Sequence, residues 1–141
     1  MQILIHKHMK INPVTHFEIP YEDKQRMAEF YEKTFGWKAR MLGEDMENYV
    51  LVTAAEANEK GFPKELGRIN GGFYEKSPNK PNQYPSVVIA VEDIKEAMDK
   101  IQTAGGKILG EPWNIKGYGI YVSFLDTEGN RLSVMQPTMQ M

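Results

Sequence analysis

This 141-residue chain contains an internal repeat with a shift of 70 residues, which restricts the folds that it can adopt. Residues 16–23 (HFEIPYED) align without a gap on residues 86–93 (SVVIAVED), and the register continues to Gly36 and Gly106. Self-similarity at a fixed period predicts repeated supersecondary units. The chain is therefore expected to contain two copies of one structural module.

Each copy begins with a strand pattern and continues into an amphipathic helix that ends at glycine. Negative charge lies where each helix begins, at Glu22 and Asp23 in the first copy and at Glu92 and Asp93 in the second, which the helix dipole favours. Gly36 and Gly105 suit the left-handed residue that follows a helix. Apolar residues recur at helical spacing in both copies: Met27, Phe30, Tyr31 and Phe35 in the first, and Ile94, Ala97, Met98 and Ile101 in the second.

Three short strand patterns follow each helix, so that each copy is predicted to be a βαβββ module. A turn pattern at 126–130 (DTEGN) joins the last two strands of the chain as a hairpin. Neither module alone could cover its sheet, so the two are expected to pack as one domain. The predicted strands after the helices are 37–42, 49–53 and 69–74 in the first module and 107–109, 118–125 and 131–136 in the second.

The repeat also sets the expected domain organisation. A single domain at 12–137 contains one module at 12–75 and a second at 86–137. The polar stretch 76–85, which is rich in proline, is interpreted as the linker between them. We interpret residues 1–11 as a leader that frays and residues 138–141 as a tail.

Composition excludes several classes of protein. Cysteine is absent, which excludes disulfides, thiolate metal sites and a cysteine nucleophile. The net charge of −2 provides no basic excess for a phosphate backbone. No apolar run is long enough to span a bilayer, and the first ten residues do not resemble a signal peptide. We therefore expect a cytoplasmic protein with neither a nucleic-acid nor a membrane partner.

Three motifs carry a family resemblance: a strand–helix block with FY and FGW at 30–37, a second block at 91–106, and the closing stretch at 126–136. Over residues 12–137 the chain resembles the vicinal oxygen chelate superfamily of glyoxalase I, ring-cleaving dioxygenases and bleomycin resistance proteins. Within that superfamily it looks like the uncharacterised branch related to lactoylglutathione lyase. The resemblance implies an α+β fold in which two βαβββ modules form a curled mixed sheet, or half-barrel. The helices then lie outside, and a ligand cavity occupies the concave face.

The resemblance also implies where a metal ion would be held. Metal-dependent relatives carry four His, Glu or Gln ligands, two from each module. These positions correspond here to His16, Ser86, Ser133 and a residue of the 69–74 strand, where Asn70 is the polar side chain. Neutral hydroxyls are poor ligands for zinc, nickel or iron. We therefore expect no cofactor, with Ni, Zn or Fe bound only by an altered ligand set.

His16 and Glu18 are the candidate catalytic residues, because they lie two apart on the predicted cavity face. One interpretation is a general acid–base pair. The other is that His16 is a hydrogen-bonded remnant of a ligand position and that Glu18 pairs with a nearby cation. The candidate ligand-binding residues are Asn70, Ser86, Trp113, Tyr121, Ser133 and Met135.

Two functions of different classes remain open. The first is a metal-free binding protein that holds a small amphipathic or aromatic molecule between the modules. The second is a lyase, an isomerase or a dioxygenase-like enzyme that uses an altered metal site or the pair His16 and Glu18. The resemblance also implies a homodimer, and the linker permits either side-by-side or swapped pairing.

Overall fold

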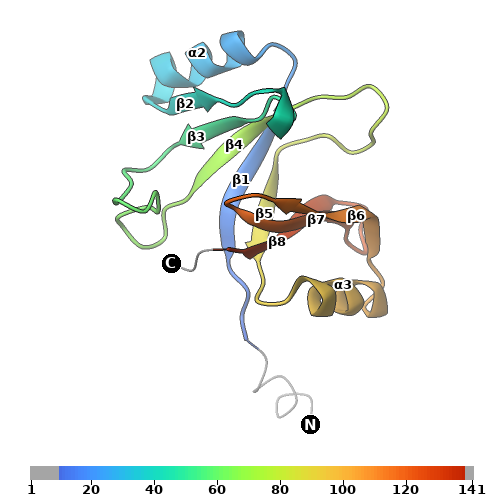
Figure 1. Cartoon of the computed structure of the whole chain (residues 1–141). Helices are drawn as coiled ribbons and strands as arrows, with labels where there is room; N and C mark the ends of the chain where they lie inside the picture. Colours follow the sequence, from blue (N-terminus) through green and yellow to red (C-terminus); the bar gives the residue numbers. More distant parts are fainter. Residues whose placement is uncertain (1–9, 139–141) are drawn as a thin grey trace.

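The computed structural model describes residues 10–138, in which eight strands form one mixed sheet flanked by two helices (Figure 1). The first module consists of β1 (Val14–Tyr21), α2 (Lys24–Phe35), β2 (Lys38–Met41), β3 (Val50–Thr53) and β4 (Asn70–Glu75). A short 3-10 turn, Glu44–Met46, precedes β3. The second module consists of β5 (Ser86–Ala90), α3 (Ile94–Thr103), β6 (Lys107–Ile115), β7 (Gly119–Leu125) and β8 (Arg131–Pro137).

The two modules meet in the middle of the sheet, whose strand order is β2-β3-β4-β1-β5-β8-β7-β6. At the junction β1 and β5 run antiparallel, with Phe17 opposite Val87 and Glu18 opposite Ser86. Each of these central strands pairs in parallel with the last strand of its own module, β1 with β4 and β5 with β8. The sheet is therefore built from two equivalent halves, and the βαβββ organisation predicted from the repeat is confirmed.

Both helices begin and end as their sequences predict. The side chain of Asp23 accepts a hydrogen bond from the amide of Arg26, and the side chain of Asp93 accepts one from the amide of Glu96. Such bonds satisfy amides that have no partner within the helix. Gly36 ends α2 with a φ of 75°, a conformation that glycine adopts without steric cost.

Two hydrophobic cores hold the helices against the sheet, one in each module. In the first, Tyr31 of α2 stacks on Trp37 at 4.7 Å between ring centres and packs against the buried Phe73. The predicted apolar face of α2 is wrong in part, because Phe30 and Phe35 are 55% and 62% exposed. The core of the second module is built around Val91, Ile94, Val122, Phe124 and Val134.

The strand β6 is longer than the predicted 107–109 and continues to Ile115. Its pairing with β7 shifts register between Leu109 and Trp113, and Gly110 has a φ of 77° there. The glycine and the following proline interrupt the strand pattern in the sequence. The irregularity nevertheless lets the strand resume, so that Trp113 lies opposite Tyr121.

The segments outside the modules are described only in part. Most of the predicted leader and tail, residues 1–9 and 139–141, lies outside the described residues. In the predicted linker 76–85, the buried side chain of Gln83 accepts a hydrogen bond from the amide of Ser77 and donates to its carbonyl. Between residues 10 and 138 no helix is long and apolar enough to cross a membrane.

Candidate functional site

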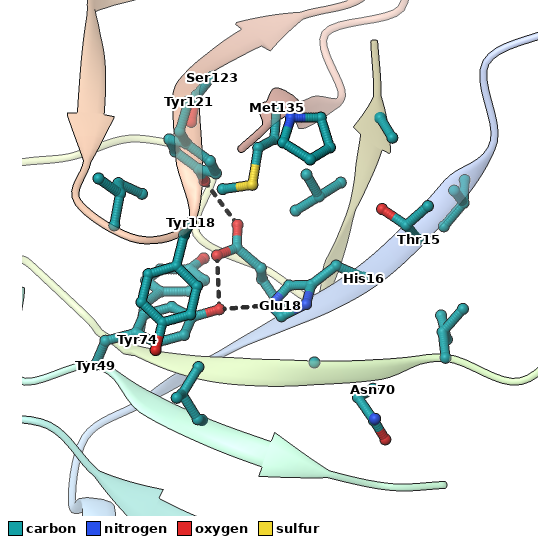
Figure 2. A pocket seen from close by; sticks show the side chains of 18 of the residues that line it. Thr15, His16, Glu18, Tyr49, Asn70, Tyr74, Tyr118, Tyr121, Ser123 and Met135 are labelled. Atoms are coloured by element: carbon teal, nitrogen blue, oxygen red, sulfur yellow. Dashed lines mark hydrogen bonds between the residues drawn. The ribbon is translucent and has the colours of Figure 1, made fainter. Parts of the chain in front are cut away.

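The sheet carries an open cavity of about 1960 Å³ that both modules line. Figure 2 shows that His16 and Glu18 of β1 point into it, between Tyr49 and Tyr74 of the first module and Tyr121 of the second. Strand alternation puts the two β1 side chains on this face, because Phe17 and Ile19 point to the opposite face and pack in the core with α2. The cavity therefore lies on the side of the sheet that the helices leave free.

Glu18 is the charged centre of this cavity. Its side chain is buried, with an exposed fraction of 6%. The hydroxyl of Tyr121 donates to Oε1 at 2.7 Å, and the hydroxyl of Tyr49 donates to Oε2 at 3.0 Å. Each oxygen thus accepts one phenolic hydrogen bond, one from each module.

The protonation states follow from burial. Burial lowers the pKa of His16 from 6.5 to about 4, so its imidazole is neutral at pH 7. Burial raises the pKa of Glu18, while the hydrogen bonds from Tyr121 and Tyr49 and the charge of Arg131 oppose that rise. Burial and the nearby Glu18 raise the pKa of both phenols, which therefore keep their protons.

The hydrogen bond between His16 and Tyr49 has a defined direction. Tyr49 has one hydroxyl proton, which it donates to Glu18, so its oxygen accepts from Nε2 of His16, 3.0 Å away. Since the imidazole is neutral, its single proton is on Nε2 and the lone pair is on Nδ1. The nitrogen that faces Tyr49 is therefore engaged as a donor within the protein.

A second set of hydrogen bonds reaches Glu18 from the other module. Ser133 donates to the hydroxyl of Tyr121 at 2.7 Å, and the hydroxyls of Ser133 and Ser123 lie 3.0 Å apart. Ser133 gives its one hydroxyl proton to Tyr121, so it accepts from Ser123, whose Oγ accepts from Nη2 of Arg131 at 3.1 Å. All these bonds point the same way, and both chains end at Glu18. The carboxylate is thus the common acceptor of the whole network.

Arg131 supplies a cation to the network without touching Glu18. Its guanidinium also lies over the ring of Tyr74, 5.4 Å from the ring centre, which is a cation–π geometry. Its charge helps to lower the pKa of Glu18. Arg131 therefore supports the carboxylate through three hydroxyl groups and through the electrostatic field, not through an ion pair.

Gly72 makes room for Tyr49 to reach Glu18. Gly72 lies opposite Glu18 in the pairing of β1 and β4, and a Cβ atom there would overlap the phenol ring of Tyr49. The neighbouring Gly71 has the same relationship with the ring of Phe17 on the other face. The adjacent glycines of β4 therefore admit one aromatic ring on each side of the strand.

The other candidate residues are distributed over different environments. Trp113 and Met135 line the cavity together with Tyr121, and Asn70 lines it at the start of β4. The Asn70 side chain is already engaged, because its Oδ1 accepts from the amides of Ala54 and Ala55 at 2.8 and 2.7 Å.

The two serines at family ligand positions lie outside the lining of this cavity. Ser133 is 1% exposed and lies behind Tyr121, in the network described above. Ser86 donates to the carbonyl of Arg131 at 2.7 Å and lines a smaller pocket of about 430 Å³ beside the 126–130 turn. Both hydroxyls therefore satisfy neighbouring groups of the protein.

These donors do not fit the four-ligand metal site implied by the family. His16 presents an N–H at Nε2, while Asn70, Ser86 and Ser133 bond to protein groups. Within the described part of the chain, no three His, Cys, Asp or Glu side chains group closely enough to hold an ion. A catalytic metal needs about three protein ligands and an open position, and the residues at the four family positions do not supply them.

Sequence reasoning missed Tyr49, Tyr74, Ser123 and Arg131 as parts of the site. Tyr49 was expected only as the start of a strand, and the segment around it gives no motif. The sequence feature that could have indicated Tyr49 is Gly72, since a glycine inside a strand indicates close approach of another group. That signal does not say which side chain approaches.

A curled sheet of two βαβββ modules with a cavity on one face defines a protein of the vicinal oxygen chelate class, as its motifs indicated. The chain belongs to the Glyoxalase/Bleomycin resistance protein/Dioxygenase superfamily, whose family model matches residues 13–134.

Relatives and solved structures agree with this assignment. The chain is 29% identical over 133 residues to a probable lactoylglutathione lyase of Vibrio cholerae, covering 91% of this chain and 93% of the relative. It is 30% identical over 121 residues to a glyoxylase-like domain-containing protein of Didymella fabae, covering 83% and 88%. A methylmalonyl-CoA epimerase of Streptomyces coelicolor has the same fold, with a TM-score of 0.67 at 14% identity, covering 92% of this chain and 100% of that one.

Proposed function

We propose that this protein binds a small organic molecule in the cavity without a metal ion. The observation that carries the proposal is the one-way network that ends at Glu18. This network commits His16 Nε2 and the Ser133 hydroxyl to neighbouring phenols, and it ends at a buried carboxylate that lines the cavity. A concave site with apolar walls and a few convergent polar groups is typical of small-molecule binding.

A second candidate is a metal-independent enzyme of the lyase or isomerase type, with Glu18 as the base. Two observations favour it: relatives are named as probable lactoylglutathione lyases, and burial raises the pKa of Glu18, which makes the carboxylate a stronger base. In this candidate Glu18 takes a proton from a carbon acid and returns it to the product. Tyr49 and Tyr121 then hold the carboxylate in place.

The metal part of the proposal is tested by elemental analysis of protein purified without chelators, followed by titration with nickel, zinc and iron. We expect less than one ion per chain and no change in thermal stability. Stoichiometric metal that is lost in His16→Ala would overturn the proposal, because it would show that an altered ligand set operates.

The binding part is tested with a broad panel of small molecules by thermal shift, followed by NMR mapping of each compound that stabilises the fold. Stabilising compounds should perturb amides around Glu18 and Tyr121. Met135→Trp, which adds bulk opposite Tyr121, should weaken these shifts, whereas Ala39→Trp on the exposed β2 should not. The proposal fails if no compound binds or if all binding maps elsewhere.

The enzyme candidate has its own readout, the turnover of a lactoylglutathione lyase assay without added metal. Turnover that disappears in Glu18→Gln with retained ligand binding would favour the enzyme over the binding protein.

The homodimer implied by the resemblance also stays a proposal, and sedimentation over a concentration series tests it. The exposed Phe30 and Phe35 of α2 are apolar surface that such a contact would cover.

A further inference from the structure

Glu18 is a buried carboxylate without a cationic partner in contact. Four ion pairs occur within residues 10–138, and all of them join exposed side chains elsewhere. Arg131 is directed to Ser123 and to the ring of Tyr74. A buried charge costs free energy unless it is paired, and part of that cost is retained here.

The carboxylate also has unused acceptor capacity. Its two oxygens have about four lone-pair sites between them, and Tyr49 and Tyr121 occupy one on each oxygen. Glu18 lines the cavity, so a ligand can reach the remaining sites.

Aromatic rings surround this carboxylate from several elements. Tyr49, Tyr74, Tyr118 and Tyr121 all line the cavity, and Figure 2 shows Tyr49 and Tyr121 on opposite sides of the Glu18 carboxylate. Trp113, opposite Tyr121 in the β6–β7 pair, also lines the cavity. The negative face of an aromatic ring attracts a cation, most strongly where water is excluded. A carboxylate among several such rings is complementary to an organic cation.

We propose that the cavity selects an organic cation, a protonated amine or a quaternary ammonium group on an apolar body, whose charged head lies at Glu18 among the tyrosine rings. This inference rests on the proposed binding function and names the class of ligand. The apolar body lies along Leu51, Val88, Ala90 and Met135, which line the same cavity. The head group then supplies a cation in direct contact with Glu18, which Arg131 does not.

Arg131 also lines the cavity and its charge acts on Glu18, but its guanidinium is held by Ser123 and by the ring of Tyr74 and does not contact the carboxylate. The other basic side chains that line the cavity are exposed, so water screens their charge. Glu18 is 6% exposed, and its charge acts through a less polar surrounding. An anionic ligand could contact the mouth but would place its charge against Glu18 on entering. The exposed basic residues are Lys10, Arg40, Lys60, Arg68, Lys76 and Lys80.

The test uses three probes of the same shape and different charge: choline, the neutral 3,3-dimethylbutan-1-ol and the anionic 3,3-dimethylbutanoate. NMR titration of the full chain measures the affinity of each probe. We expect choline to bind about tenfold more tightly than the alcohol, with the anion weakest. Glu18→Gln should lower choline affinity about tenfold and change the affinity of the alcohol about twofold at most. The exposed Glu29→Gln on α2 is the matched control and should change neither.

A second variant keeps the inference falsifiable if Glu18→Gln does not fold. Tyr118 is exposed, and its hydroxyl makes no hydrogen bond to the described part of the chain, so the ring can be removed without disturbing the network. Tyr118→Leu should weaken choline binding several-fold, whereas Tyr118→Phe should retain it.

The outcomes separate this inference from the binding function on which it rests. Equal affinity for all three probes, or choline affinity that survives both Glu18→Gln and Tyr118→Leu, would overturn the cation preference and leave small-molecule binding intact. A cavity that binds neutral or anionic panel members but not choline would overturn the cation preference in the same way. Absence of binding across the whole panel would overturn both.

Discussion

The hydroxyl of Tyr121 on β7 lies 2.7 Å from Oε1 of Glu18 on β1, so a side chain of the second module is bonded to the charged centre of the first. The two residues are 103 positions apart in the chain. Their contact crosses β5 and β8, the strands that separate β1 from β7 in the sheet. The site therefore depends on correct packing of both halves, and several measurements can detect its loss.

Removing the Tyr121 hydroxyl should destabilise the folded protein. Tyr121→Phe deletes a hydrogen bond to a buried charged group, and bonds of this kind contribute roughly 1.5–3 kcal/mol. Urea unfolding at pH 7 measures the change in free energy of unfolding. Tyr118→Phe is the matched control and should change it by less than about 0.5 kcal/mol, because that residue is exposed. If Tyr121→Phe and Tyr118→Phe changed the free energy of unfolding equally, the hydrogen bond from Tyr121 to Glu18 would be contradicted.

His16 should titrate far below an ordinary histidine. Its pKa of about 4 predicts that the imidazole NMR signals shift near pH 4, whereas a solvated histidine shifts near 6.5. His16→Asn assigns the signal, because it removes one of only three histidines in the chain. A midpoint between 6 and 7 would show that the side chain is solvated and that the bond to Tyr49 is absent.

The same depressed pKa makes stability depend on pH. Between 6.5 and about 4 the unfolded chain binds a proton at His16 that the folded chain does not. The contribution of this residue is therefore fully present above pH 6.5 and falls by about 3 kcal/mol as the pH drops toward 4. Urea unfolding of the parent and of His16→Asn over this interval measures it. The variant should show the smaller loss, and parallel curves would contradict the prediction.

Glu18 should act in the opposite direction. Its pKa is raised from 4.5, so the folded protein holds the proton at pH values where the unfolded chain has released it. Its contribution is therefore present below about 4.5 and is lost as the pH rises through the folded pKa. Glu18→Gln has no such titration. The free energy of unfolding of the variant minus that of the parent should therefore increase as the pH rises. A constant difference over the whole range would exclude a raised pKa.

Gly72→Ala should disturb the site through Tyr49. The added methyl group overlaps the phenol ring, and overpacking of this kind costs roughly 1–3 kcal/mol. In a Tyr49→Ala background the same change has no ring to displace and should cost much less. A double-mutant cycle of the free energy of unfolding measures this coupling. If the two changes in free energy of unfolding were additive, the ring of Tyr49 would not lie against Gly72.

Most of the fold was predictable because its signals are local. The Asp23 and Asp93 caps, the glycine after α2 and the turn at 126–130 depend on neighbouring residues, and the structure contains each of them. The repeat then supplied the pairing of two equivalent modules. The prediction was wrong where local patterns mislead: β6 continues past Gly110, and Phe30 and Phe35 remain exposed.

The site was predictable only in outline. Strand alternation put His16 and Glu18 on one face, because the side-chain period of a strand is two. It could not identify Tyr49 as their shared partner, since that residue precedes β3 and reaches Glu18 across Gly72. Strand alternation also assigned Ser133 to the cavity face, whereas in the structure its hydroxyl donates to Tyr121 and lies outside the cavity lining.

The amino-acid sequence specifies two βαβββ modules and their order, because periodicity, caps and repeats are properties of short segments. The family resemblance adds the residues at the ligand positions. What those side chains contact depends on the tertiary structure. The direction of a hydroxyl proton is set by its partners, and here the partners come from β1, β7, β8 and the segment before β3. Once the sheet brings them together, one carboxylate is the acceptor for every bond around it. The cavity is therefore organised around Glu18.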